Sequence, residues 1–326
     1  MSKLLDIKNL TVEFQRNGVY TPVISDLSLQ INENEALGIV GESGSGKSVT
    51  SLAVMGLLPS KNCHVSGEIE FEGHDLISAS KKEMQEIRGN RIAMIFQEPM
   101  TSLNPVHTCG KQITESILLH TKRSKKEAME KALNLLNLCG IPSPEQRLKE
   151  YPHQLSGGMR QRVMIAIALA CDPVLLIADE PTTALDVTIQ AQILQLLRDL
   201  RDEKHMSVMM ITHDLGIVSG FCDRVAVVYA GQVVEIAPTR QLFGEPLHPY
   251  TGGLILALPQ MGKVGKLETI EGMVPDVDEM PTGCHFHPRC QFATDRCRQE
   301  QPPLFTLADG RAVRCFVAQE KNSTAS

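Results

Sequence analysis

The sequence predicts an α/β fold built on a mostly parallel sheet that is covered by helices. Three apolar runs without alternation, at residues 36–40, 174–178 and 207–212, predict strands buried on both faces. Each run ends in glycine or in polar residues, as strands of such sheets do when they lead into a loop. Between the runs, apolar residues recur at helical spacing, and we therefore expect strands and helices to alternate along the chain.

The domain organisation follows from where this alternation stops. Charged segments at 111–120 and 124–139 have helical periodicity, and no strand-like run interrupts residues 99–160. After residue 250 the alternation fades, while proline, glycine and cysteine recur. We expect one domain over residues 1–250 with an inserted helical subdomain at about 99–160, followed by a small cysteine-rich appendage over residues 251–326.

Composition excludes several classes of protein. The 326 residues include 32 Lys and Arg against 38 Asp and Glu, a formal net charge of −6, and only 4% are aromatic. Extensive nucleic-acid binding needs positive charge and stacking rings, so we expect no nucleic-acid partner. No run reaches the roughly 18 apolar residues of a membrane helix. Charges fall where a signal peptide would carry its apolar core, so we expect a cytoplasmic chain.

Residues 41–48 read Gly-Glu-Ser-Gly-Ser-Gly-Lys-Ser and match the P-loop pattern, between the first predicted strand and a helix. Glycines let successive backbone N–H groups converge on a phosphate chain at the positive end of a helix. Lys47 adds a positive charge, and the Ser48 hydroxyl can bind Mg²⁺. The alternative is an ordinary glycine turn before a helix. The pattern predicts a P-loop NTPase.

Two carboxylates follow the second apolar run. In a doubly wound sheet, ligands bind beyond the carboxyl ends of the strands, so Asp179 and Glu180 are expected to face the same crevice as the phosphates. We expect Asp179 to hold Mg²⁺ through water and Glu180 to polarise the attacking water. Without the P-loop pattern, the pair would indicate only a solvated strand end.

A second glycine turn precedes the helical run at 163–170. Residues 155–162 read Leu-Ser-Gly-Gly-Met-Arg-Gln-Arg. Ser156, Gly157 and Gly158 could present backbone N–H groups to a second set of phosphate oxygens at a helix N-terminus. Taken alone, the turn fits an ordinary N-cap by Ser156 equally well.

The turn at 155–159 resembles the signature motif of the ATP-binding cassette (ABC) family, and the resemblance covers about residues 4–250. Met159 departs from it mildly, since glutamine is commoner there. Further motifs follow in the family's order. Gln97 resembles the Q-loop glutamine, residues 184–186 resemble the D-loop, and His213 resembles the switch histidine.

This resemblance implies that ATP is hydrolysed between two cassettes arranged head to tail, with the P-loop of one facing the 156–158 turn of the other. It implies Glu180, His213 and Lys47 as catalytic residues, and Ser48 with Gln97 as Mg²⁺ ligands. Phe14 lies where an aromatic ring that stacks on adenine is found, with Tyr20 as the alternative. The remaining residues expected to contact nucleotide are Ser43, Gly44, Ser45, Gly46, Val49 and Asp179.

Residues 248–251, His-Pro-Tyr-Thr, and the segment at 100–105 resemble ATPases of bacterial oligopeptide, dipeptide and nickel importers. The likeness is greatest to the ATP-binding subunits of dipeptide permeases. It implies that hydrolysis powers import of dipeptides or related small peptides through separate permease subunits. Oligopeptide, nickel or haem cargo stays open as an alternative.

The same resemblance implies the partners and the location. The partners would be a second ABC ATPase subunit, expected to be a paralogue, two integral membrane permeases, and a periplasmic peptide-binding protein that acts through them. The chain would lie peripherally on the cytoplasmic face of the bacterial inner membrane. One alternative is a soluble ABC protein of translation, DNA repair or cluster assembly. A P-loop kinase or GTPase is disfavoured by the 155–159 turn and His213.

Four of the nine cysteines gather near the end of the sequence: Cys284, Cys290, Cys297 and Cys315. Five, six and seventeen residues separate them, and none of these gaps is the two-residue spacing of zinc ribbons or bacterial ferredoxins. By ligand count, four thiolates suit Zn²⁺ and a [4Fe–4S] cluster equally, with His285 and His287 as substitute ligands. Similar tails in peptide-importer ATPases are associated with an iron–sulfur cluster, which the resemblance therefore favours over zinc or unligated thiols.

Arginines lie near these four cysteines in the sequence, and further cysteines lie elsewhere in the chain. Five arginines could offset the negative charge of a four-thiolate centre: Arg289, Arg296, Arg298, Arg311 and Arg314. The five remaining cysteines are scattered, and we expect them to be buried as small hydrophobic residues: Cys63, Cys109, Cys139, Cys171 and Cys222.

Overall fold

The structure, a computed structural model, describes most of the chain: residues 2–183, 185–258 and 270–323. The chain divides into two compact units. We call residues 1–78 with 211–326 the terminal unit, and residues 79–210 the central unit. None of the described helices is long and apolar enough to cross a membrane.

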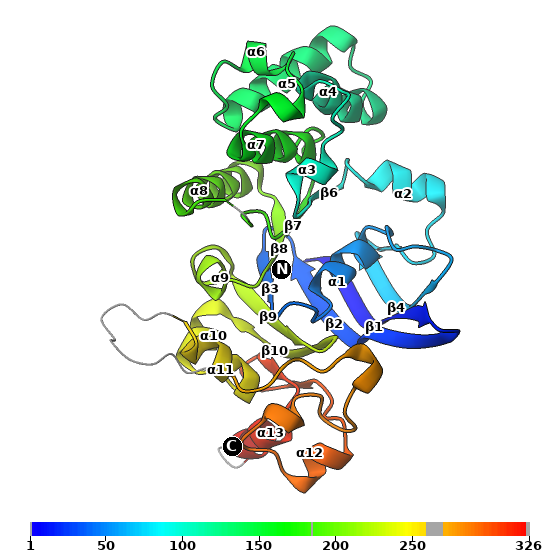
Figure 1. Ribbon diagram of the computed structural model, residues 1–326, viewed down its shortest axis with the longest axis vertical. Coiled ribbons are helices and arrows are strands. Elements are labelled where there is room, and N and C mark those ends of the chain that lie inside the picture. Colours follow the sequence, from blue (N-terminus) through cyan, green and yellow to red (C-terminus); the bar gives the residue numbers. More distant parts are fainter. Residues whose placement is uncertain (1, 184, 259–269, 324–326) are drawn as a thin grey trace. The chain divides into compact units, whose positions relative to one another are not determined.

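An antiparallel sheet, in the order β2-β1-β4-β5, forms the N-terminal part of the terminal unit (Figure 1). Its strands are β1 (Lys3–Arg16), β2 (Val19–Asn32), β4 (Cys63–Phe71) and β5 (His74–Asp75). Leu5, Ile7 and Val12 are fully buried on β1, as expected of a strand with one face on a core. The sequence pattern did not predict this sheet, because register shifts, one of them between Ile7 and Leu10, interrupt the two-residue period.

The other strands of the terminal unit lie in the order β11-β12-β10-β9-β3. They are β3 (Ala36–Val40), β9 (Arg224–Tyr229), β10 (Gln232–Pro238), β11 (Phe305–Thr306) and β12 (Ala312–Val313). β3 is parallel to β9 and fully buried, as predicted for residues 36–40. β10 is antiparallel to β9, and β12 is antiparallel to β10. C-terminal residues therefore extend the same sheet, and the expected domain boundary at residue 250 stays a prediction.

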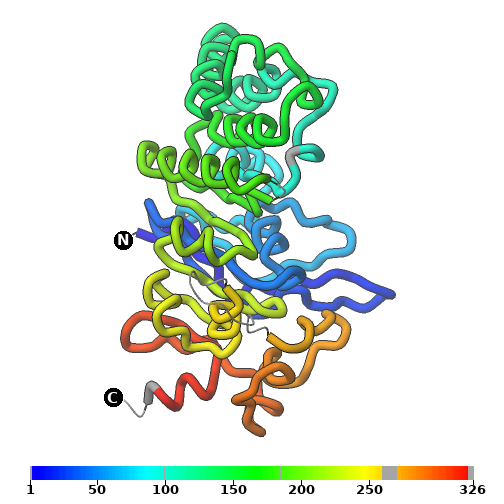
Figure 2. The backbone as a smooth tube through the Cα atoms, turned by 60° about the vertical axis from the view of Figure 1, so that its left-hand side comes forward, coloured from blue at the N-terminus to red at the C-terminus, as the bar shows by residue number. Residues whose placement is uncertain are grey.

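Helices complete the terminal unit: α1 (Lys47–Val54), α9 (Leu215–Phe221), α10 (Thr239–Gly244), α11 (Pro249–Leu256), η2 (Val277–Glu279), η3 (His287–Arg289), α12 (Asp295–Gln299) and α13 (Phe316–Ser323). The chain after α11 turns back along the N-terminal sheet. Figure 2 shows its orange part beside the tip of the blue β1–β2 hairpin, where Arg16 donates a hydrogen bond of 3.4 Å to Asp278.

The strands of the central unit lie in the order β8-β7-β6. They are β6 (Ile92–Ile95), β7 (Leu175–Asp179) and β8 (Ser207–Thr212), the strand within which the chain passes into the terminal unit. β6 and β7 are parallel, with Ile95 opposite Ala178, and every residue of the three strands is buried. The predicted parallel strands, buried on both faces, are confirmed here.

Only helices and loops lie between β6 and β7 (teal to green in Figure 1). The helices of the central unit are α2 (Lys81–Ile87), α3 (Pro99–Ser102), α4 (Cys109–His120), α5 (Lys125–Leu138), α6 (Pro144–Arg147), η1 (Pro152–Gln154), α7 (Gly157–Ala168) and α8 (Val187–Lys204). α5 begins at a capping box, in which Ser124 accepts from Glu127 N and the Glu127 carboxylate accepts from Ser124 N. This segment fits the expected helical subdomain, whose bounds of 99–160 stay a prediction.

Candidate functional site

The loop of residues 41–46 joins β3 to α1 and is folded around the amine of Lys47. Lys47 Nζ donates hydrogen bonds to the carbonyl oxygens of Gly41 (2.9 Å) and Glu42 (2.8 Å), and the residue is only 6% exposed. Gly46, which precedes α1, has a φ of 97° and offers no capping side chain. A helix that starts in this way keeps its positive dipole end for an anion. We call residues 41–48 the phosphate loop.

The turn between β9 and β10 fixes the position of this loop. A Cβ atom at Gly41 would lie 2.1 Å from Val228 O, which no side chain tolerates, so the loop needs glycine there. Gly231 N donates a hydrogen bond of 3.1 Å to Ser45 O. The path of the phosphate loop is therefore set by tertiary contacts as well as by its own glycines.

The other residues predicted around the nucleotide within the terminal unit differ in exposure. Ser43 and Gly44 are exposed, Ser45 is fully buried, and Ser48 and Val49 are half-buried at the start of α1. The exposed pair therefore forms the outer part of the loop, while Ser45 belongs to its packed base.

Three further candidates of the terminal unit lie near strand ends. Phe14 is half-buried on β1 opposite Thr21, and Tyr20 is exposed at the start of β2. His213 is exposed in the short link between β8 and α9. The next residue, Asp214, caps α9 by accepting from Gly216 N at 2.7 Å.

The central unit brings Gln97 and Glu180 together. Glu180 Oε2 accepts hydrogen bonds from Gln97 Nε2 (3.1 Å) and Thr183 Oγ1 (2.8 Å). Asp179 is buried at the end of β7, and the chain turns at Glu180 with a φ of 47°, a value that side-chain-bearing residues rarely adopt. Such conformations are often found at functional sites, and Glu180 is the residue that directly follows the end of the strand.

The second glycine turn is an ordinary helix start. Ser156, with a φ of −68°, caps α7 by accepting from Met159 N at 3.3 Å. Ser156 and Gly157 are exposed, and a Cβ at Gly157 would meet nothing within 4 Å. A Cβ at Gly158 would lie 3.1 Å from Ile189 Cγ2 of α8. Of the D-loop at 184–186, Ala184 lies outside the described residues, while Asp186 caps α8.

The His-Pro-Tyr-Thr segment starts α11 and is fully packed. His248 is buried and accepts a hydrogen bond from Tyr250 N at 3.1 Å. Burial lowers the pKa of His248 to about 3, so its ring is neutral near pH 7. The buried Glu235 carboxylate accepts from the N–H groups of Leu247 (2.9 Å) and His248 (2.8 Å). These bonds fix the start of α11 and the direction of Tyr250.

The sequence pattern missed two residues that touch the phosphate loop, Tyr250 and Arg289. The sequence places Tyr250 in a family-like segment and predicts Arg289 only as a counter-charge for a metal centre. Both contact Glu42, from positions more than 200 residues away in the chain. No local sequence signal indicates such a contact.

Four cysteines, Cys284, Cys290, Cys297 and Cys315, line one small cavity of about 10 Å³, which has room for about one water. Burial raises the pKa of Cys284 to about 11, and the other three thiols add to this effect. Within the described ranges, no group of three or more His, Cys, Asp or Glu side chains could hold a metal ion. The predicted gathering of the cysteines is present, but this arrangement supports neither the predicted iron–sulfur cluster nor zinc as its alternative.

The arginines of this segment have other partners than the cysteines. Arg314 donates to carbonyl oxygens of Val233, Pro302 and Asp26, and Arg311 pairs with Asp309. Arg296 pairs with Glu300. Of the scattered cysteines, Cys109, Cys139 and Cys222 are buried as expected, whereas Cys63 and Cys171 are only half-buried.

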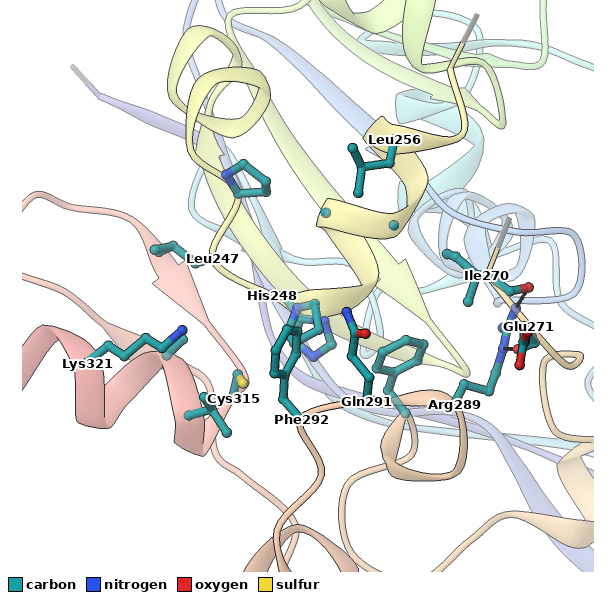
Figure 3. A pocket seen from close by; sticks show the side chains of 17 residues that line it. Leu247, His248, Leu256, Ile270, Glu271, Arg289, Gln291, Phe292, Cys315 and Lys321 are labelled. Atoms are coloured by element: carbon teal, nitrogen blue, oxygen red, sulfur yellow. Dashed lines mark hydrogen bonds between the residues drawn. The ribbon is translucent and has the colours of Figure 1, made fainter. Parts of the chain in front are cut away.

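A larger cavity of about 570 Å³ lies between α11 and the C-terminal residues. Figure 3 shows Arg289 at one edge of it and Cys315 at the opposite edge, with His248 between them. His287 and His248 also line the small cysteine cavity. His287 Nδ1–H donates to Cys284 O (3.0 Å), and His285 Nδ1–H donates to Ala230 O (3.1 Å).

Comparison with known proteins gives the family. A family model described as "ABC transporter" matches residues 24–183, and one described as "Oligopeptide/dipeptide transporter, C-terminal region" matches residues 234–297. The chain is 53% identical to the oligopeptide transport ATP-binding protein AppD of Bacillus subtilis over the full length of both chains. It is 50% identical to the dipeptide transport ATP-binding protein DppD of Escherichia coli over 96% of each chain.

Solved structures agree with this assignment. A dimeric, post-hydrolysis structure of the ATP-binding cassette MJ0796 with ADP and Pi shares 29% identity and a TM-score of 0.65, covering 72% of this chain and 99% of that one. The structure of cbiO1 from Clostridium perfringens has a TM-score of 0.64 at 28% identity, over 75% of this chain and 92% of that one. The chain therefore belongs to the ABC ATPase family, in the group that shares the C-terminal region of oligopeptide and dipeptide transporters.

Proposed function

We propose that this chain is the ATP-hydrolysing subunit that powers import of peptides through separate membrane subunits. One observation carries the proposal: a phosphate loop wrapped around Lys47 occurs in a chain that is similar over its full length to peptide-transport ATP-binding proteins. As a member of the ABC ATPase family, the chain binds ATP with Mg²⁺.

The residue roles follow from the resemblance and are supported by the local geometry. Lys47 and the backbone of residues 43–48 would hold the phosphates, Ser48 and Gln97 would bind Mg²⁺, and Asp179 would hold it through water. Bound Mg²⁺ would offset the charge of the phosphate oxygens. Phe14 would stack on the adenine. These donors fit the group, because hydroxyl, amide and carboxylate oxygens are the ligands that Mg²⁺ prefers.

Glu180 is proposed to orient and polarise the attacking water, with His213 directed at the terminal phosphate. The hydrogen bonds of Glu180 to Gln97 and Thr183 support this role, because they restrict the carboxylate to one orientation. In this scheme the Ser156, Gly157 and Gly158 turn of a second cassette completes the site. The dimeric form of MJ0796 supports such a pairing.

Assembly with the transporter tests the proposal. The full chain, co-expressed with its adjacent genes and extracted in mild detergent, is expected to co-purify with two integral membrane proteins. Hydrolysis of MgATP by this assembly should rise when a peptide-loaded binding protein is added. A chain that stays free of membrane proteins and carries bound nucleic acid would instead support the alternative, a soluble ABC protein.

The finer features of this function stay within the proposal. The opposing cassette would be a paralogue, the binding protein would be periplasmic, and the chain would lie peripherally on the cytoplasmic face of the bacterial inner membrane. Dipeptides are the proposed cargo, although relatives at 53% and 50% identity carry the names of oligopeptide and dipeptide transporters. Uptake of labelled di-, tri- and pentapeptides into cells with and without the gene separates these, with nickel and haem uptake as further arms.

We also propose that Cys284, Cys290, Cys297 and Cys315 hold a [4Fe–4S] cluster. The donor set fits, since four thiols converge on one cavity. In a cubane cluster each cysteine binds a different iron, so the sulfurs stand farther apart than four ligands of one ion. The proposal rests on the family resemblance and on the shared cavity, since no group of three or more such side chains in the described ranges could hold a metal ion as it stands. The cavity is closed around about 10 Å³, so the cysteine side chains would have to turn outwards around the cluster.

Anaerobic purification of the full chain tests the cluster. We expect a brown protein with an absorbance near 400 nm that dithionite bleaches, and about four iron and four sulfide per chain. Cys284→Ser should abolish both signals, while the matched control Cys222→Ser, at a buried cysteine outside the cavity, should keep them. A colourless protein with stoichiometric zinc would overturn the proposal in favour of the alternative metal.

A further inference from the structure

Two residues of the C-terminal region hold one residue of the phosphate loop. Glu42 N donates a hydrogen bond of 3.0 Å to the Tyr250 hydroxyl. Arg289 Nη1 lies 3.1 Å and 3.2 Å from the two carboxylate oxygens of Glu42. The backbone and the side chain of Glu42 are thus both held from outside the loop.

Tyr250 is a rigid support. Its side chain is fully buried, and its ring centroid lies 4.7 Å from that of Tyr229 and 5.4 Å from that of Phe286. The buried His248 and Glu235 fix the backbone at the start of α11. The hydroxyl therefore cannot follow the loop if the loop moves, and it defines where the Glu42 N–H group lies.

Arg289 is equally constrained. Its side chain is 7% exposed, and its Nε donates to Glu271 O at 2.9 Å. The guanidinium lies 5.7 Å from the centroid of the Tyr229 ring, within the range of a cation–π contact. Figure 3 shows Arg289 beside Ile270 and Glu271 at the edge of the larger cavity, and the next residue, Cys290, lines the cysteine cavity.

Glu42, the residue held by Tyr250 and Arg289, also accepts a hydrogen bond from Lys47. Glu42 O accepts from Lys47 Nζ at 2.8 Å, while the N–H of the same residue is bound by Tyr250. In addition, the Glu42 carboxylate places a negative charge on a loop that binds phosphates. Arg289 offsets that charge at a distance of 3.1 Å. Without Arg289, the carboxylate would repel a bound nucleotide.

We propose that Tyr250 and Arg289 are positioning residues of the ATP site, which act through Glu42 to fix the loop and to cancel its negative charge. The C-terminal region is then a structural part of the nucleotide site. This inference rests on the proposed function only in that residues 41–48 bind ATP. Neither side chain is assigned any contact with the nucleotide itself.

Combined substitutions of Arg289 and Glu42 in the full chain test whether Arg289 acts by offsetting the charge of Glu42. Arg289→Gln should weaken ATP binding by about three- to tenfold, the order of magnitude that one uncompensated charge near a site produces. Adding Glu42→Gln to Arg289→Gln should restore the affinity, because it removes the carboxylate charge that Arg289→Gln leaves unpaired. Arg16→Gln is the matched control, because it removes a surface pair with Asp278 and should change nothing. A titration with a fluorescent ATP analogue measures all four chains.

Tyr250→Phe tests the second contact and serves as the independent arm if Arg289→Gln fails to fold. It keeps the ring packing and removes only the acceptor of Glu42 N–H, so we expect a two- to fivefold loss of ATP affinity at unchanged kcat. A lower melting temperature of Tyr250→Phe at unchanged ATP affinity would show a merely structural role and would overturn the inference for Tyr250. For Arg289→Gln, a loss of affinity that Glu42→Gln does not rescue would do the same. Lys47→Ala distinguishes a wrong ATP site from wrong roles of Tyr250 and Arg289. If Lys47→Ala also leaves the ATP affinity unchanged, the proposed ATP site is wrong. If only Lys47→Ala lowers the affinity, the ATP site stands and the roles of Tyr250 and Arg289 are refuted.

Discussion

The helices α1 and α7 both begin at a glycine-containing turn. The turn before α1 is enclosed by other residues of its unit, whereas the turn before α7 is exposed. The phosphate loop is enclosed: Lys47 is folded onto it, Gly231 binds Ser45 O, and Tyr250 binds Glu42 N. The turn at Ser156 has a conventional cap and an open face, since Gly157 is exposed and a Cβ atom added there would meet no described atom within 4 Å.

This difference indicates a division of labour. A loop whose shape is set within one chain can bind nucleotide by itself, whereas an open turn can contribute only when another molecule covers it. ATP affinity of the isolated chain should therefore depend on the phosphate loop, and turnover should depend on both turns. Four substitutions test the comparison, in order of decreasing expected effect.

Glu180→Gln should lower ATP turnover by roughly two to four orders of magnitude, the range for loss of a positioned base. Glutamine keeps the shape of the side chain but cannot polarise water as a carboxylate does. Nucleotide affinity should stay near that of the parent chain, because neither turn is altered. Steady-state hydrolysis together with a nucleotide titration measures both, and near-normal hydrolysis would contradict the role of Glu180.

Lys47→Ala should weaken ATP binding by the isolated chain by roughly ten- to a hundredfold, because charge-assisted hydrogen bonds to phosphate are lost. Lys61→Ala removes an exposed lysine of the same unit and is the matched control. Equilibrium titration with a fluorescent nucleotide measures the effect. An unchanged ATP affinity would show that the phosphate loop does not determine nucleotide binding by the isolated chain.

Gly157→Asp tests directly whether the turn at Ser156 affects turnover without affecting ATP binding by the isolated chain. The new side chain meets nothing within the chain, so folding and ATP affinity of the isolated chain should stay within about twofold. Turnover should fall by about tenfold or more, because a carboxylate would then face the phosphates across the dimer. Gly244→Asp, at another open glycine, should leave turnover unchanged. Loss of affinity in the isolated Gly157→Asp chain would show that the two turns are not distinct.

Asp172→Asn should have the smallest effect and leave both turns unaffected. Asp172 bridges Lys131 of α5 (2.6 Å) and Lys204 of α8 (3.2 Å), and its side chain is 48% exposed. Such pairs contribute about 1 kcal/mol or less, and asparagine tolerates the φ of 51° at this position. Urea unfolding at low and high salt measures the loss, which should shrink as salt screens the pair.

The same pair has a definite pH dependence. Burial acts to raise the pKa of Asp172, but hydrogen bonds and charge from Lys131 and Lys204 outweigh it and lower the pKa. A carboxylate with a lowered pKa stabilises the fold above its unfolded pKa of about 3.9, and this stability is lost as the pH falls through the folded value. The difference between Asp172→Asn and the parent should therefore vanish in acid. A difference that persists at pH 2 would point to packing rather than charge.

The parts of the fold that could be predicted are those with an uninterrupted local pattern. Residues 36–40 and 207–212 coincide with β3 and β8, because strands buried on both faces require continuous apolar runs. The antiparallel sheet of β1, β2 and β4 was missed, because its bulges break the alternation and its long-range pairing leaves no local signal.

For the proposed site, sequence reasoning could name the candidates whose roles would rest on their own chemistry. Lys47 and Glu180 stand in motifs whose spacing follows from the shape of a phosphate chain and the end of a strand. The contacts of Glu42 with Tyr250 and Arg289 could not be predicted, because these residues lie 208 and 247 positions after Glu42 in the sequence. Arg289 carried a charge whose partner could not be known from the sequence, and the structure pairs it with a carboxylate.

The ion pair between Glu42 and Arg289 has a consequence for how such chains are inherited and recombined. Glu42 and Arg289 form an ion pair in the described part of the chain, so a substitution that removes one charge would leave the other without this partner. Chimeras that exchange tails between paralogues are expected to keep tight nucleotide binding only where the transplanted position 289 matches the resident position 42. The transplanted tail would also have to supply Tyr250, the second residue that holds Glu42.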